Sequence, residues 1–324
     1  MEQAGRSNQA TVDLRPGSGE RARGREPGLG ALERAQLRKT PGFYRRSWNR
    51  FRKNHLALGS LMVIALIGLF VLSAGLISRY VTGFSYSENH LADKLSPPMT
   101  NGYVLGSDGN GRDILTRLAY GGRVSLMIAF LSTFATLVLG GGVGLVSGYF
   151  GGWVDSLLMR LVDVLLAIPG LALLILITTL YRPGPVGLAF VLAGVSWPGI
   201  ARIIRGEVLS LRRREYIEAA RVVGAPAWRI LTRHLLPNIM PLIVIYAAIA
   251  IPVLIVDEAA LSYLGVGVQV PTPSWGNMLG EATQFLRAYP AKVIIPGAMI
   301  YLTSLALYLV GNGIRDAFDP RLGD

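Results

Sequence analysis

Residues 215–237 read EYIEAARVVGAPAWRILTRHLLP, a charged segment set between two long apolar runs. Its first part favours a helix, and Gly224 supplies the left-handed residue that ends such a helix, with Pro226 shortly after that end. A second short helix is expected over residues 227–236. The sequence therefore predicts two short helices, joined at a glycine, that lie outside the membrane.

The small side chains of the first helix suit contact with another protein. Ala219 and Ala220 let a groove on a partner approach the backbone closely, while Glu218 offers one directional charge. This pattern predicts a cytoplasmic docking helix that fits a socket on another chain. The alternative is an ordinary basic loop between membrane helices, in which Glu218 pairs with Arg214 and Arg221 at helical spacing.

The apolar residues on both sides of this segment come in blocks. The chain has 324 residues, of which 51% are hydrophobic, and six uncharged runs reach the roughly 20 helical residues needed to cross a hydrocarbon core. A seventh run, residues 259–280, holds prolines and amides that would go unsatisfied in lipid, so we expect a surface loop on the outer face. The predicted fold class is an all-α membrane protein with six transmembrane helices. The predicted spans are about 56–78, 125–150, 160–181, 184–203, 236–257 and 292–313.

The charge distribution gives the orientation of the spans. With six spans and the N-terminus inside, the inner segments carry 24 of the 32 Lys and Arg residues and the outer segments carry 8. This excess follows the positive-inside rule, and the opposite orientation inverts it. We therefore expect a multi-pass protein of the plasma or inner membrane with both termini in the cytoplasm. Topology, rather than binding to nucleic acid, explains the net charge of +12.

The first 55 residues differ in composition from the rest of the chain. Residues 1–40 are rich in Arg, Gly, Glu and Pro and hold few large apolar residues, which predicts a disordered cytoplasmic tail. Residues 41–55 mix aromatic and basic side chains just before the first span, as an interfacial helix on an anionic leaflet does. Residues 56–324 then form the six-helix membrane domain.

The sequence holds no catalytic, cofactor-binding or metal-binding pattern. There is no cysteine, and the three histidines, His55, His90 and His234, are scattered without the spacing of metal ligands. No lysine follows a glycine, so the chain lacks a P-loop for ATP hydrolysis. If the protein drives uphill transport, the energy must enter from another polypeptide.

Two pairs of charged residues lie at the ends of predicted spans. Arg160 and Asp163 are one helical turn apart at the inner start of the third span, where they form either a structural ion pair or an inner gate. Asp257 and Glu258 close the fifth span. Because no third ligand is nearby, we interpret them as carboxylates solvated at the interface rather than as a cation site.

Glycine recurs every four residues in the second predicted span, at Gly140, Gly144 and Gly148. Such a seam lets another helix backbone approach closely. The approaching helix belongs either to this chain's own bundle or to a sister subunit.

The docking segment also carries a family resemblance. The spacing of residues 218–237 resembles the signature loop of permease subunits of ABC importers. In that loop, Glu-Ala-Ala is followed after three residues by a glycine, here Gly224. After nine further residues comes an apolar position, and after one further residue comes a Leu-Pro pair, here Leu236-Pro237. This chain has His234 where the family has an apolar residue. The resemblance implies the permease fold of type I ABC importers. The residues that it assigns to ATPase coupling are Glu218, Ala219, Ala220, Gly224, Leu236 and Pro237.

Two further stretches resemble one branch of this family. Residues 103–126, YVLGSDGNGRDILTRLAYGGRVSL, and residues 259–282, AALSYLGVGVQVPTPSWGNMLGEA, are similar to the second permease subunit of dipeptide and oligopeptide importers, whose relatives also carry nickel. Within the first stretch, Asp113 and Arg117 form a predicted i, i+4 pair on the helix that leads into the second span. The resemblance covers about residues 43–324.

The resemblance implies an assembly and a cargo. A member of this branch pairs with a related but different permease, binds two cytoplasmic ATPase subunits and receives short peptides from an extracytoplasmic binding protein. The chain itself would be no enzyme and hold no cofactor, because ATP is bound by the partner subunits. Nickel, glutathione or an oligosaccharide is the alternative cargo.

Two alternatives belong to other classes of protein. One is a secondary transporter or channel, and the other is a membrane scaffold whose inner loop recruits a partner. A secondary transporter should carry ionisable residues deep in its spans or broken helices in matched halves. The centres of the predicted spans are uncharged, and the sequence shows no internal repeat.

Overall fold

The computed structural model describes residue 48 and residues 50–318. The chain divides into two compact units, Met1–Phe43 and Tyr44–Asp324, and every described residue belongs to the second unit. The predicted tail, residues 1–40, and more than half of the predicted interfacial helix, residues 41–55, lie outside the described part.

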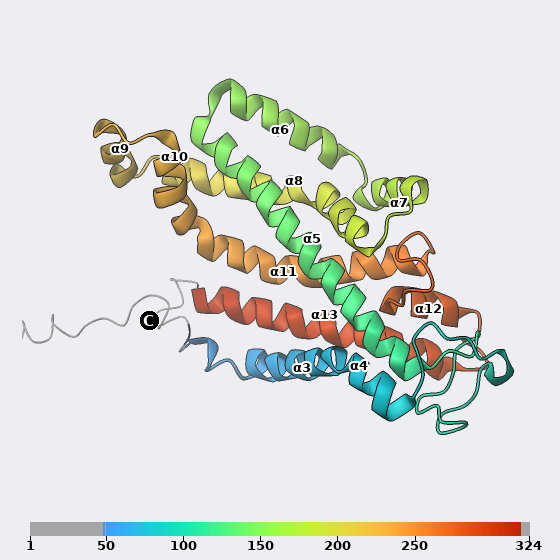
Figure 1. Cartoon of the computed structure of the whole chain (residues 1–324). Helices are drawn as coiled ribbons and strands as arrows, with labels where there is room; N and C mark the ends of the chain where they lie inside the picture. The colour runs from blue at the N-terminus through green and yellow to red at the C-terminus, as the bar shows by residue number, and fades with distance from the viewer. Residues whose placement is uncertain (1–47, 49, 319–324) are drawn as a thin grey trace, which may run out of the picture. The chain divides into compact units, whose positions relative to one another are not determined.

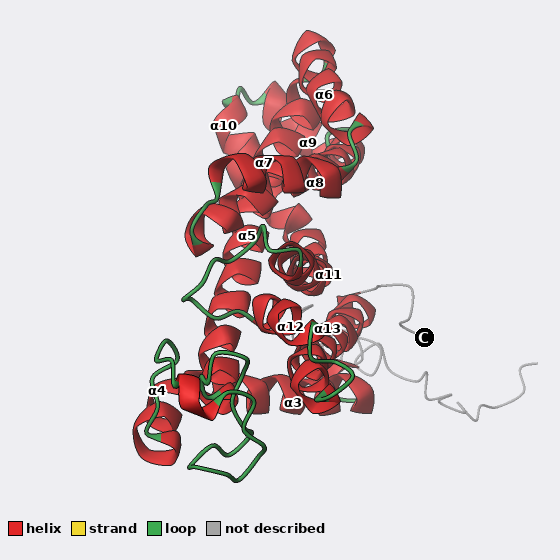
Figure 2. Cartoon of the chain, turned by 90° about the vertical axis from the view of Figure 1, so that its right-hand side faces the viewer, coloured by secondary structure: helices red, strands yellow, loops and turns green. Residues whose placement is uncertain are grey.

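The described part is built from helices (Figures 1 and 2), and no strand occurs in it. η1 and η3 are π-helical turns, whereas η2 is a 3-10 turn. In chain order the elements are α3 (His55–Leu72), α4 (Ala74–Leu76), η1 (Ile77–Thr82), η2 (Leu91–Asp93), α5 (Ile114–Phe150), α6 (Gly152–Ala167), α7 (Gly170–Tyr181), α8 (Pro185–Leu211), α9 (Glu215–Val222), α10 (Ala227–Arg229), η3 (Ile230–Leu235), α11 (Leu236–Tyr263), α12 (Trp275–Thr283) and α13 (Pro290–Phe318).

Five of the helical segments are long and apolar enough to cross a membrane, or six when α6 and α7 are counted as one broken span. α6 and α7 are bent by 83° relative to each other. The break falls at Ile168 and Pro169, because a proline lacks the N–H that would continue the helix. The third predicted span, residues 160–181, falls on parts of both helices. The five unbroken segments are His55–Leu72, Ile114–Phe150, Pro185–Leu211, Ala227–Tyr263 and Pro290–Ala317.

The glycine seam of α5 faces α8 of the same chain. A Cβ at Gly140 would lie 2.7 Å from the Trp197 carbonyl oxygen, and a Cβ at Gly144 would lie 2.6 Å from the Ala201 carbonyl oxygen. Real Cβ atoms do not approach so closely, so only glycine lets the two backbones pack at this distance. Of the two alternatives for this seam, the structure selects the chain's own bundle.

The remaining long helices complete the bundle. α11 lies beside both α5 and α13, and α13 also packs against α3. A buried apolar cluster forms where α5, α7, α8 and α11 meet, around Ile128, Leu174, Leu188 and Leu254. The start of α3, the end of α13 and α9 lie at one end of the helices, and the loop over residues 83–113 lies with α12 at the other (Figure 1). We call these the α9 end and the α12 end.

The prediction of a surface loop over residues 259–280 holds only in part: residues 264–274 form a loop with exposed residues, whereas α11 runs to Tyr263 and α12 begins at Trp275. Trp275 begins α12, is completely buried and donates from Nε1 to the Leu118 carbonyl at 2.9 Å. Ser274 and Asn277 form a capping box, and Asn277 also donates to a backbone carbonyl of the preceding loop at 2.9 Å. Since the amide expected to go unsatisfied has internal partners, the segment can be buried.

Candidate functional site

The helix α9 ends at a glycine in the left-handed conformation, as the sequence predicts. Gly224 has a φ of 84°. Its N–H donates to the Arg221 carbonyl at 2.9 Å, and the N–H of Ala225 donates to the Ala220 carbonyl at 3.0 Å. A Cβ at Gly224 would meet no atom within 4 Å. The constraint on this position is therefore its backbone angle and not the space around it.

One buried side chain fixes α9 to the bundle. Ile217 is completely buried and packs in a cluster with Ile230 and Ile239, which also includes residues of α8. Burial of a side chain of this size contributes about 1.5 to 3 kcal/mol. Ala220 and Leu236, two predicted coupling residues, pack partly against the same cluster. α9 is thus fastened to α8 and to the start of α11.

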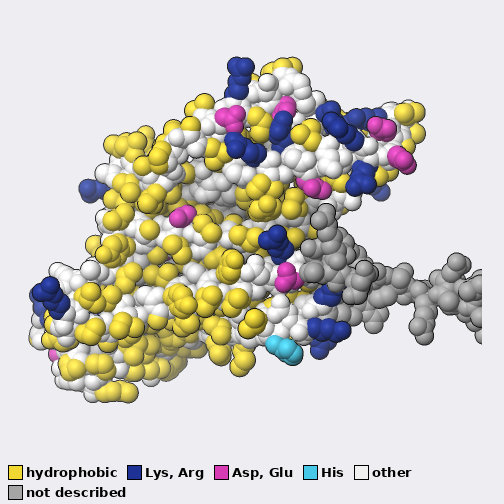
Figure 3. Space-filling model, turned by 180° about the vertical axis from the view of Figure 1, so that it is seen from behind, with side chains coloured by type: hydrophobic (Ala, Val, Ile, Leu, Met, Phe, Trp, Pro, Cys, Tyr) yellow, Lys and Arg dark blue, Asp and Glu magenta, His cyan; other side chains and the backbone are white. Residues whose placement is uncertain are grey.

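Other side chains of the α9 segment are exposed and apolar. Val222 and Val223 are each 87% exposed, and Trp228 is 71% exposed. Glu218 and Ala219 are exposed as well. We call these five residues the α9 surface. Figure 3 shows charged side chains gathered at the α9 end and a hydrophobic band between the two ends. Exposed apolar groups outside such a band indicate a contact with another protein.

Sequence reasoning selected Glu218 and Ala219 but missed the large apolar side chains of the α9 surface. The signal was present, because two adjacent valines and a tryptophan stand inside an otherwise charged segment. α10, η3 and α11 run on as one segment, so the second predicted helix becomes the start of Ala227–Tyr263. Pro237 is exposed in the first turn of α11.

The structure does not pair Arg160 with Asp163, which corrects the predicted ion pair. Asp163 instead accepts from Arg202 Nη2 of α8 at 2.5 Å, with more than half of each side chain exposed. A second pair joins the same two helices, since Arg205 donates to Asp155 Oδ1 at 2.5 Å and to Oδ2 at 2.6 Å. α6 begins well before Arg160, so the predicted gate residues lie inside the helix rather than at its start.

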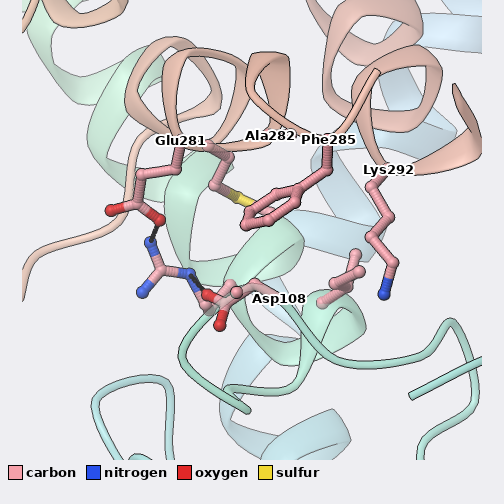
Figure 4. A pocket seen from close by; sticks show the side chains of 9 residues that line it. Asp108, Glu281, Ala282, Phe285 and Lys292 are labelled. Carbon is pink, nitrogen blue, oxygen red and sulfur yellow. Dashed lines mark hydrogen bonds and ion pairs between the residues drawn. The ribbon is translucent and has the colours of Figure 1, made fainter. Parts of the chain in front are cut away.

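At the α12 end, buried charges hold the loop over residues 83–113. Arg112 donates from Nε to Asp108 at 2.7 Å and from Nη2 to Glu281 Oε2 at 2.5 Å. Arg117 Nη2 donates to the same Glu281 oxygen at 3.1 Å. Figure 4 shows Asp108 and Glu281 on either side of a guanidinium group. Because both arginines are buried, their charges depend on these two carboxylates.

Asp113 does not pair with Arg117, contrary to the prediction. Asp113 caps α5, and its Oδ2 accepts from the Thr116 N–H at 2.7 Å. Burial raises the pKa of the Asp113 carboxyl above its ordinary value, although the bond from Thr116 acts in the opposite sense. Arg117 bonds instead to Glu281, a residue 164 positions away in the chain.

Lys292 of α13 binds the backbone of the same loop. Its Nζ donates to the carbonyls of Ser107 and Ser96, the second at 3.2 Å. The Ser107 hydroxyl in turn donates to the Asp93 carbonyl. Residues of α5, α12 and α13 therefore all hold this loop in place.

The interpretation of Asp257 and Glu258 as solvated carboxylates is wrong for Glu258. Glu258 is completely buried and accepts from the hydroxyls of Ser262 at 2.7 Å and Ser125 at 2.8 Å. Ser125 also accepts from the backbone N–H of Trp275 at 3.2 Å. Glu258 thus joins α5, α11 and α12, and serine hydroxyls take the place of the expected water.

Comparison with known protein families identifies the family of this chain. Residues 140–324 match the family model of binding-protein-dependent transport system inner membrane components. The chain belongs to this family. Residues 42–98 of the permease also match the N-terminal TM domain of oligopeptide transport permease C. The family predicted from the docking segment is confirmed: the protein is a transmembrane permease subunit of an ABC importer and has no ATPase site of its own.

Individual relatives cover most of the permease. It is 40% identical over 274 residues to the oligopeptide transport system permease protein OppC of Escherichia coli, which covers 84% of this chain and 89% of that protein. It is 36% identical over 279 residues to the dipeptide transport system permease protein DppC of Alkalihalophilus pseudofirmus, covering 86% and 90%. It is 37% identical over 287 residues to the glutathione transport system permease protein GsiD of Pectobacterium atrosepticum, covering 88% and 92%.

A solved structure has the same fold. The permease aligns with a chain of the inward-facing MetNI methionine ABC transporter with a TM-score of 0.51 and 21% identity, covering 62% of this chain and 96% of that chain. The importer fold predicted from the sequence is confirmed, and the secondary transporter, channel and scaffold alternatives are excluded.

Proposed function

We propose that this permease forms part of the translocation pathway for di- or oligopeptides and that α9 receives the force of ATP binding from a cytoplasmic ATPase subunit. The observation that carries the coupling role is the α9 surface. Val222, Val223 and Trp228 are exposed beside Glu218 and Ala219, on a helix fixed underneath by the buried Ile217. Such a surface suits the socket of a partner.

The packing of α9 supports a mechanism for coupling. ATP binding closes the two ATPase subunits on each other and moves the sockets that hold α9. Ile217 shares one cluster with residues of α8 and of the start of α11. A displacement of α9 is therefore transmitted to both helices as a rigid-body rotation, which opens the pathway to the other side.

The α9 residues divide into three roles in this mechanism. Glu218 and Ala219 contact the socket, and Ala220 and Leu236 pack between α9 and the bundle. Gly224 ends α9 at a fixed angle, and Pro237 lies in the first turn of α11.

The proposed partners are two ATPase subunits, a second and different permease, and an extracytoplasmic binding protein that delivers the cargo. We place the α9 end in the cytoplasm together with both chain termini. The positive-inside distribution supports this orientation. So does the arrangement in which α3 begins, and α13 ends, at the α9 end (Figure 1).

We keep the proposal of an inner gate at Asp163, with Arg202 in place of Arg160 as the residue that pairs with it. Asp163 binds Arg202 across α6 and α8 in an exposed pair, and such pairs contribute only about 0 to 1 kcal/mol. A contact of this strength can open and close during transport. Arg160 stays a predicted gate residue on the same helix.

Peptide cargo is supported by the relatives, whose names assign them dipeptides, oligopeptides and glutathione. Glutathione is itself a short peptide and lies within the proposed class. The test is uptake of radiolabelled di-, tri- and pentapeptides into proteoliposomes that hold the complete complex and its binding protein. We expect uptake only with ATP. Uptake driven by a proton or sodium gradient without ATP would contradict the proposal, and uptake of nickel or an oligosaccharide but of no peptide would contradict the cargo.

A further inference from the structure

A groove runs between α11 and α13 and plays no part in the proposed coupling mechanism. Its volume is about 430 Å³, within the range of roughly 300 to 1,000 Å³ that is usual for small-molecule sites. Its wall is apolar except for one carboxylate and the hydroxyls of α13. We call it the α11–α13 groove and define it by Ile249, Val253, Asp257, Tyr301, Ser304 and Tyr308.

Asp257 differs from its neighbour Glu258 in how its charge is compensated. Glu258 is buried and accepts two serine hydroxyl bonds. Asp257 is half-buried in the wall of the groove and makes no hydrogen bond or ion pair with any residue that the structure describes. The chain satisfies one carboxylate internally and leaves the other facing the groove.

The position of Asp257 makes an unpaired carboxylate costly in lipid. Asp257 lies six residues before the end of α11, about 9 Å along the helix from that end, within the candidate span Ala227–Tyr263. Ionisable residues within such segments face the bundle interior, water-filled cavities or partners, and they mark substrate pathways. In a permease, such a residue is therefore a candidate for contact with the cargo.

The other polar groups of the groove suit a cation. The Ser304 hydroxyl oxygen is buried without a hydrogen-bond partner among the described residues. Tyr301 and Tyr308 are 64% and 50% exposed and line the same groove. A carboxylate beside aromatic rings binds an ammonium group by an ion pair and by attraction to the ring faces. A divalent metal ion, in contrast, gathers several oxygen ligands.

We propose that Asp257 binds the ammonium group at the amino terminus of the cargo peptide while the peptide passes through the α11–α13 groove. This inference rests on the proposed peptide function and assigns a recognition residue to it. One carboxylate matches one ammonium group, and the apolar wall accepts the peptide side chains. Peptides with a free amino terminus are the ligands that this site selects.

The test compares one radiolabelled tripeptide with its N-acetylated form in proteoliposomes that hold the complete complex. Both peptides are supplied at concentrations that saturate the binding protein, so that its own selection cancels. The wild-type permease should transport the free-amino peptide faster, and Asp257→Asn should lower its rate roughly tenfold, the effect expected for loss of a charge-assisted hydrogen bond. The rate for the acetylated peptide should not change.

Two variants serve as controls. Asp257→Glu keeps the charge and should retain most of the preference for the free amine. Glu88→Gln removes an exposed carboxylate from the loop over residues 83–113 and should leave both rates unchanged.

Three outcomes would overturn the inference. If both peptides slow equally in Asp257→Asn and less of the second permease is recovered with it, Asp257 pairs with the neighbouring subunit instead. If neither rate changes, the carboxylate does not meet the cargo. If the wild type transports neither peptide although ATP is hydrolysed, the peptide function itself fails and the inference falls with it.

Discussion

The α9 segment and the loop over residues 83–113 both connect membrane helices and both expose large apolar side chains, but only the loop also buries a charged network. Val222 is 87% exposed at the α9 end, whereas Arg112 is 4% exposed at the α12 end. Arg112 and Arg117 share Glu281 as a partner within this chain. The α9 surface lacks such coverage.

The difference indicates which parts of the permease are complete in one chain. The loop over residues 83–113 binds the Arg112 charge to Glu281 of α12 and its backbone carbonyls to Lys292 of α13 within this chain. The α9 surface leaves apolar area in water, a cost that a bound partner removes. Changes at the α12 end should therefore act on stability, and changes at the α9 end should act on assembly and transport.

The largest effect on stability is expected from Glu281→Ala. The variant leaves two buried guanidinium groups without this carboxylate, and breaking a buried ion pair costs about 3 kcal/mol or more. The purified complex in detergent should unfold at a clearly lower temperature. Glu88→Ala, which removes a carboxylate that is 53% exposed, is the matched control and should change little. Equal, small shifts for both variants would show that the network does not hold the loop.

Ala219→Arg should leave the stability of the permease nearly unchanged but disrupt the partner contact. Ala219 is exposed on α9, and arginine has a helix propensity close to that of alanine. The added bulk and charge should lower the recovery of ATPase subunits and the rate of transport roughly tenfold or more. Ala288→Arg, at an exposed position of the α12 end, should transport normally. Normal transport by both variants would remove α9 from the coupling mechanism.

Gly224→Val should cost about 1 to 2 kcal/mol, because a β-branched residue disfavours the left-handed conformation. Space is not the cause, since a Cβ there meets nothing within 4 Å. Gly224→Asn should be tolerated better, because asparagine adopts this conformation more readily. Transport should fall in the order wild type, Asn, Val. If Val and Asn behave alike, the left-handed turn does not set the angle of α9.

The smallest effect is expected from Arg202→Ala. Its ion pair with Asp163 is more than half exposed and is worth no more than about 1 kcal/mol. Thermal unfolding should barely move, whereas Arg205→Ala, which breaks two bonds to the less exposed Asp155, should be more destabilising. A large loss of stability in Arg202→Ala would contradict a weak gate contact at this position.

Local signals allowed the helices and the end of α9 to be predicted from the sequence. Apolar runs mark the spans, and Gly224 marks a helix end by its own backbone preference. The side-chain hydrogen bonds and ion pairs at the α12 end could not be predicted from local sequence signals. Arg117 and Glu281 are 164 residues apart, and Ser125 and Glu258 are 133 apart. Spacing within a helix suggested Asp113 as the partner of Arg117, and tertiary packing overrode it.

The same limit explains why the buried helix α12 was not predicted within residues 259–280. Prolines and amides argue against a lipid-facing helix, and that argument holds. It does not require exposure to water, because Asn277 bonds to Ser274 and to carbonyls of the preceding loop. Sequence composition shows that polar groups need partners, but only the fold shows where the partners are.

The central claim is that the α9 surface contacts the ATPase subunit, and cross-linking tests it most directly. The chain has no cysteine, so Val222→Cys carries the only thiol of the permease and can be labelled with a thiol-reactive photo-crosslinker. Gln284→Cys, at an exposed position of the α12 end, is the control. Illumination of the complete complex should join the permease to an ATPase subunit from position 222 and not from position 284. Absence of that product from position 222, with the ATPase subunits bound and transport intact, would contradict the account.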